Sequence, residues 1–193
     1  MPNRDIISGL TPVNSLNSSD YQGKLRQIAF AGNDGVACFL GDLVKLTGTV
    51  DATGKIPVVA QIAAGEASIG VLVALDPDFA NESFANIYRL ADTARTGYIL
   101  QGQDVLYEIQ EDSDANDIEI AEAGWNINVI VGTGDTVTGV SGMEIDSNTA
   151  AATDSLNLRL HHIARKPDNV LGTNAIWVVS INNSQEALNQ TGT

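Results

Sequence analysis

The residues best suited to bind a ligand form an acidic stretch in the second half of the chain. Asp112, Asp114 and Asn116 follow the D-x-D-x-N opening of a calcium loop, which places oxygen ligands on alternate residues. The pattern then breaks, because Asp117 stands where the sharp turn needs glycine and Ala123 where a bidentate glutamate belongs. We therefore expect a solvated acidic hairpin loop and no bound metal or other cofactor, with a cation site at these three residues as the alternative.

The other reactive side chains do not combine into a catalytic pattern. His161 and His162 are adjacent, so on a strand they point to opposite faces and cannot share a metal ion or a substrate. Glu108 and Glu111 also fall on opposite faces of a strand, which argues against a glycosidase pair. Cys38 is the only cysteine, and its apolar neighbours indicate a small buried side chain. We expect no enzymatic activity.

The net charge of the chain argues against some classes of binding partner. Its 24 acidic and 10 basic residues give a formal net charge of −14, which repels phosphate backbones and anionic lipids. No stretch reaches the ~20 apolar residues of a membrane span, and residues 1–10 lack the apolar run of a signal peptide. We expect a protein that is made in the cytoplasm, stays in solution, and binds neither nucleic acid nor membranes.

Three stretches between residues 41 and 75 organise the rest of the chain. Residues 42–47, 56–62 and 69–75 are rich in β-branched side chains and alternate apolar with small or polar positions, as strands do. The turns between them, at residues 51–54 and 63–66, each carry a glycine suited to positive φ. The pattern predicts a three-stranded meander.

Further short strands complete the predicted fold. Residues 79–94 fit either a helix or a loop with a turn or two of helix, and residues 97–100 and 104–110 are expected to pair. Other strands are expected at residues 25–31, 36–40, 125–131, 156–163 and 175–181. Many short strands separated by turn signals predict an all-β fold, either a barrel or a jelly-roll-like sandwich of short antiparallel strands.

The two ends of the chain differ in composition from this β domain, which we place at residues 25–181. Residues 1–24 contain isolated apolar side chains without a strand or helix period, and they predict an extended N-terminal arm. Such an arm lies either on its own domain or on a neighbouring subunit. Residues 182–193 form a polar C-terminal tail.

Short fragments along nearly the whole chain resemble one family, the head decoration proteins of tailed bacteriophages, also called cement or auxiliary capsid proteins. Each fragment is a turn or part of a strand, and the resemblance depends on their shared order. The fragments are SGLTPV at residues 8–13, GDLVKL at 41–46, IGVLV at 69–73, YR at 88–89 with TAR at 93–95, EIQED at 108–112, GVSGME at 139–144, RKPDN at 165–169 and GTNA at 172–175.

The resemblance implies a structural protein on the outer surface of the virion head, made in the host cytoplasm. It would bind the major capsid protein, cement neighbouring capsid subunits and associate with itself, as a homotrimer. We hypothesise that the arm crosses a neighbouring subunit while the meander builds the trimer core. The arm residues expected to contact the capsid or another subunit are Arg4, Ile6, Ile7, Leu10, Val13, Leu16 and Tyr21.

A different class of protein also fits the composition, a carbohydrate- or host-surface-binding β module. In that interpretation Tyr107, Trp125 and Trp177 stack on sugar rings, and the loop at Asp112 holds calcium. Both tryptophans fall in alternating stretches, where packing in a core or an interface is the commoner use.

Overall fold

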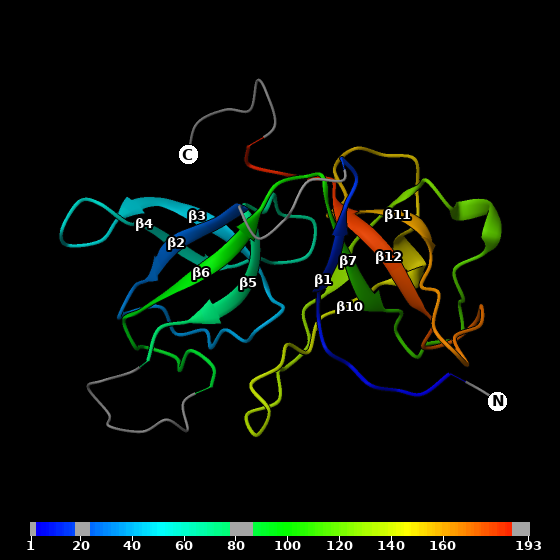
Figure 1. Cartoon of the computed structure of the whole chain (residues 1–193), viewed down its shortest axis with the longest axis horizontal. Helices are drawn as coiled ribbons and strands as arrows, with labels where there is room; N and C mark the ends of the chain where they lie inside the picture. The colour runs from blue at the N-terminus through cyan, green and yellow to red at the C-terminus, as the bar shows by residue number, and fades with distance from the viewer. Residues whose placement is uncertain (1–2, 18–23, 78–86, 187–193) are drawn as a thin grey trace.

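The computed structural model describes residues 3–17, 24–77 and 87–186 and shows an all-β chain in two halves that lie side by side (Figure 1). One half is a closed barrel and the other is an open sheet of five strands. The described residues include no α-helix, and short 3-10 turns form at η2 (Ile120–Glu122) and η3 (Ser147–Thr149). The predicted all-β fold of short, mostly antiparallel strands is confirmed.

The barrel closes in the order β2-β4-β3-β5-β6, so each of its strands has a neighbour on both sides. All of its pairs are antiparallel except β2 with β4, which is parallel. Aliphatic side chains, Phe30 and Cys38 fill its interior. The strands are β2 (Leu25–Phe30), β3 (Leu43–Val50), β4 (Pro57–Gln61), β5 (Gly70–Leu75) and β6 (Arg95–Gln101).

The open sheet has the order β1-β7-β12-β11-β8, with every pair antiparallel. A two-stranded sheet, β9 (Val129–Ile130) with β10 (Glu144–Ile145), lies beside it. The five strands are β1 (Thr11–Ser15), β7 (Val105–Gln110), β8 (Asn126–Ile127), β11 (Leu158–Ile163) and β12 (Ile176–Ile181).

One hydrophobic cluster joins the two halves. Leu43, Val71 and Leu100 of the barrel are buried in the same cluster as Tyr107 and Trp177 of the open sheet. Because burial of apolar surface is the main stabilising contribution, this shared core fixes the barrel against the sheet. Both halves therefore form one rigid support for the segments at the surface.

Several details of the predicted topology are wrong, although most strands form where expected. The three stretches between residues 41 and 75 become β3, β4 and β5, but β4 and β5 lie on opposite sides of β3, so they are not a meander. The expected pair at residues 97–100 and 104–110 is divided, because β6 ends in the barrel and β7 begins the open sheet. At Gly102, where φ is 122°, the chain crosses between the two halves.

Two expected strands and the helix candidate also differ. Residues 125–131 divide into two short strands, β8 and β9, because Asn128 N between them donates to Thr149 Oγ1 (3.0 Å). The two strands then pair in different sheets. Residues 36–40 form only isolated bridges at Cys38 and Leu40. Residues 87–94 form a loop with turns and no helix, and residues 78–86 lie outside the described residues.

Candidate functional site

The N-terminal arm lies on its own domain, which settles the alternative that the sequence left open. Leu10 is 1% exposed and belongs to the shared core, and its backbone N donates to Gly41 O (3.0 Å). Gly9 has φ 61°, and a Cβ there would lie 2.4 Å from Ser141 Cβ, so only glycine fits. β1 then pairs with β7 at the edge of the open sheet.

The residues before β1 are tied down by hydrogen bonds to the same chain. Asn3 Nδ2 donates to Val170 O (2.8 Å) and Thr173 O (3.0 Å), and Asn3 Oδ1 accepts a bond from Val170 N (3.0 Å). Ile6 N donates to Gln110 Oε1 (2.8 Å). The main chain of the arm is therefore fixed on the sheet, while most of its apolar side chains remain in solvent.

The predicted contact residues divide into three groups. Those with exposed side chains are Arg4, Ile6 (59% exposed), Ile7, Val13 and Leu16. Leu10 has no surface to offer a partner, so the expectation of a contact at this residue is wrong in the docked arm, where it anchors the core. Tyr21 lies outside the described residues.

The acidic loop uses its carboxylates to hold the chain together. Asp112 Oδ1 accepts a bond from Ser147 N (3.3 Å), and Asp114 accepts bonds from Asn116 N (2.7 Å) and Ser147 Oγ (3.1 Å). The side chain of Asn116 donates to Asn148 Oδ1. Within residues 3–17, 24–77 and 87–186 no three His, Cys, Asp or Glu side chains converge as metal ligands. The geometry gives the cation-site alternative no support.

Glu111 is a buried carboxylate whose role the sequence did not reveal. Its Oε1 accepts a bond from Ile118 N (2.6 Å) and its Oε2 from Trp177 Nε1 (3.0 Å), so it ties the acidic loop to β12. Burial raises the pKa of Glu111 to about 7, against the effect of these two donors. Two acceptor bonds to fixed partners indicate a structural role.

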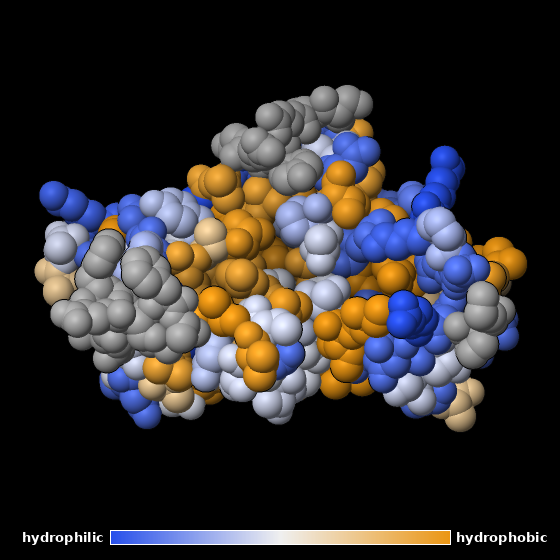
Figure 2. All heavy atoms as spheres, turned by 60° about the horizontal axis from the view of Figure 1, so that its bottom comes forward, coloured by the Kyte–Doolittle hydropathy of each residue, from blue (hydrophilic) through white to orange (hydrophobic). Residues whose placement is uncertain are grey.

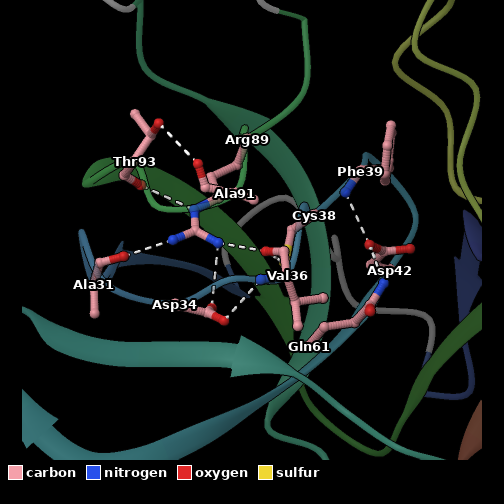
Figure 3. A network of polar contacts seen from close by, with 10 residues as sticks. All are labelled: Ala31, Asp34, Val36, Cys38, Phe39, Asp42, Gln61, Arg89, Ala91 and Thr93. Atoms are coloured by element: carbon pink, nitrogen blue, oxygen red, sulfur yellow. Dashed lines mark hydrogen bonds and ion pairs between the residues drawn. The ribbon is translucent and has the colours of Figure 1, made fainter.

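Arg89 holds the described end of the loop before β6 against the barrel (Figure 3). Its guanidinium is fully buried, lies 5.4 Å from the centre of the Phe30 ring, and forms an ion pair with Asp34 (3.3 Å). It also donates to three main-chain carbonyls, those of Ala31, Val36 and Thr93. These contacts satisfy a buried charge, so they stabilise the loop without forming a reactive site.

The histidines and the cysteine are placed as the sequence predicts. His161 Nε2 contacts Ser180 Oγ (2.9 Å) across β11 and β12, while the ring of His162 is exposed and contacts Ile163 O (3.0 Å). Cys38 is buried, and burial raises the pKa of its thiol to about 12, which keeps it protonated. Glu108 is bound to Lys166 and does not meet Glu111.

Comparison with known proteins adds no relative: no protein family, curated protein or solved structure matches the chain. In the part of the chain that the structure describes, no helix is long and apolar enough to cross a membrane.

Proposed function

We propose that this protein is a structural component of a bacteriophage virion, which binds the outside of the capsid and cements neighbouring major capsid subunits. The order of the sequence fragments that resemble decoration proteins supports this proposal. The observation that carries it is the docked arm, whose exposed apolar side chains, Ile6, Ile7, Val13 and Leu16, project from a main chain fixed on a rigid sheet.

A fixed arm suits binding to a large surface. Its main chain is already ordered, so binding the capsid costs less conformational entropy than ordering a loose arm. Many copies on one shell, or the three copies of a homotrimer, add avidity to each weak contact. This arrangement replaces the hypothesis that the arm crosses a neighbouring subunit, because Leu10 and β1 complete the fold of their own chain.

The closed barrel also changes the expected contacts between copies. β3, β4 and β5 each have a neighbour on both sides, although β5 pairs with β3 only at Leu43 and Val44, so most of the main chain of the supposed meander is already paired within the barrel. The edges of the open sheet are β1 and β8. Asn126 of β8 is already bridged to Ala151, so strand pairing between copies in the proposed homotrimer would use β1.

Carbohydrate binding remains the second candidate because one aromatic side chain reaches solvent. Trp125 is 40% exposed, whereas Tyr107 and Trp177 are buried and cannot stack on a sugar. A single exposed tryptophan, together with carboxylates already bonded within the protein, supports this function less well than the arm supports capsid binding.

Binding to heads tests the proposal directly. Purified protein is mixed with phage heads that lack it, and the bound fraction is measured by sedimentation. We expect saturable binding that a double variant, Ile6→Ser with Ile7→Ser, weakens about tenfold or more, while Val50→Ser on the barrel hairpin leaves it unchanged. Absence of binding by the wild-type protein would contradict the proposed function.

A further inference from the structure

The loop between β9 and β10, residues 132–142, projects on the same side of the molecule as the segment before β1 (Figure 1). Figure 2 looks toward this side and shows apolar side chains gathered along its middle, with hydrophilic ones toward both ends. The sequence of this loop, GTGDTVTGVSG, indicated only a glycine- and threonine-rich connection. The structure gives this connection a defined shape.

Asp135 holds the tip of the loop. Its Oδ1 accepts a bond from Val137 N (2.8 Å), and its Oδ2 accepts one from Thr138 Oγ1 (2.8 Å). The main chain closes the tip as well, since Asp135 N donates to Val140 O (2.9 Å) and Gly139 N donates to Asp135 O (2.8 Å). Four bonds within six residues make the tip a preformed turn.

The base of the loop is clamped to the barrel half. Leu40 N donates to Gly139 O (3.0 Å), and Ser141 N donates to Leu40 O (2.8 Å). A Cβ on Gly134 would lie 2.3 Å from Cγ of the Phe39 ring, so the loop passes directly over that ring. The Phe39 ring in turn stacks on Tyr88, with ring centres 4.6 Å apart. The loop is therefore held at both its base and its tip.

This ordered tip presents an apolar side chain to solvent. Val137 is 83% exposed, more than any other large hydrophobic side chain in the described residues. Ile130 and Val131, just before the loop, are also exposed. The base of the loop adjoins the arm, because a Cβ on Gly9 would lie 2.4 Å from Ser141 Cβ. The loop and the arm are therefore neighbours at the surface.

The charges around this surface indicate what kind of partner it fits. The Asp135 carboxylate lies at the tip beside Val137, and residues 130–144 contain no lysine or arginine. A second copy that docked through the same loop would bring a second Asp135 carboxylate against the first, which is repulsive. A partner surface with an apolar socket and a basic rim is complementary in both respects.

We propose that Val137 is a preformed knob that inserts into an apolar socket with a basic rim on the major capsid protein. This inference rests on the proposed function and deepens it, because it names the part of the chain that enters the capsid surface. A side chain that is fully desolvated on binding and held by a rigid loop is the kind of contact that dominates interface energetics.

Substitution at the tip tests the knob by the same sedimentation assay with phage heads. We expect Val137→Ser to weaken head binding about tenfold and Val137→Asp to weaken it further, because the aspartate adds a buried charge. Ile120→Ser is the matched control, since Ile120 is 73% exposed on η2, away from this loop. It should change binding less than twofold. Thermal unfolding of all three variants should match that of the wild-type protein.

The possible results separate the inference from the function it rests on. If the wild-type protein binds heads and Val137→Ser binds equally well, the knob is wrong and the cement function stands. If the wild-type protein does not bind heads, both the role of Val137 and the cement function are contradicted. If Val137→Ser instead lowers the mass of the free protein in light scattering, the loop joins copies of this chain, and the assignment to the capsid is overturned.

Discussion

Truncation of Leu10 distinguishes an arm that belongs to its own domain from one that is free to bind a neighbour. Leu10 is 1% exposed within the shared core, so Leu10→Ala removes buried methyl groups and leaves a cavity. Large-to-small substitutions of this kind cost about 2–5 kcal/mol. Ile6→Ala is the matched control on the same arm, because Ile6 is mostly exposed and such substitutions change stability by less than about 0.5 kcal/mol.

Urea unfolding of the free protein, monitored by tryptophan fluorescence, measures this difference. With a denaturant dependence of about 2 kcal/mol per molar urea, Leu10→Ala should lower the unfolding midpoint by about 1–2.5 M, and Ile6→Ala should leave it within about 0.3 M. Equal midpoints for Leu10→Ala and the wild-type protein would show that the arm is undocked in solution. That result would refute the placement of the arm and restore the idea that it crosses to a neighbour.

Three further predictions concern the buried polar groups. Glu111 has a folded-state pKa of about 7 against 4.5 for a free glutamate, so the folded state binds more protons between these values and stability falls as the pH rises through them. At 1.36 kcal/mol per pKa unit this loss of stability is about 3 kcal/mol. Glu111→Gln should therefore flatten the dependence of the unfolding free energy on pH, as measured by urea unfolding. A variant with the same pH dependence as the wild-type protein would contradict this prediction. A lysine cannot reproduce the three carbonyl contacts and the ion pair of the Arg89 guanidinium. Arg89→Lys should therefore lower the unfolding free energy by at least about 2 kcal/mol. An unchanged melting temperature would argue against the network. Cys38 should react with a thiol-specific reagent only after unfolding in urea, and rapid labelling of the native protein would show that its burial is wrong.

The sequence predicted strands well where one face of a strand meets a core, and less well where both faces do. Alternation placed Ile69 and Val71 on one face of β5, yet Val71 lies in the shared core, whereas Ile69 and Leu72 lie in the barrel interior. β5 is packed on both sides and has an irregular register between Leu72 and Ala74, so its pattern does not report a single buried face. The position of the strand along the chain was predictable, but the core that each of its side chains enters was not.

Strand partners depended on interactions between distant residues. No local pattern indicates that β6 and β7, separated by three residues, belong to different halves, or that β2 pairs with β4 in parallel. Gly102 adopts a positive φ at that crossing, but the presence of a glycine in the sequence does not reveal the change of sheet. Local propensity is a weak guide when tertiary packing decides which edges meet.

The residues of the candidate surface were only partly predictable, because tertiary packing also decides which apolar side chains are buried and which are exposed. The isolated apolar residues of the arm did not separate Leu10, which is buried, from Ile6 and Ile7, which are exposed. Val137 gave no signal within its glycine- and threonine-rich stretch, because its importance comes from the bonds that Asp135 makes around it. Glu111 acquires its role only when the fold brings Trp177 to it.

The central claim, that this protein cements a phage head, is tested most directly by the stability of heads to which it is added. DNA-filled heads that lack the protein are heated with and without saturating amounts of it, and DNA release is followed with an intercalating dye. We expect the purified protein to raise the temperature of DNA release, and the double variant Ile6→Ser with Ile7→Ser to raise it much less. An unchanged release temperature at saturated binding would contradict a cementing role.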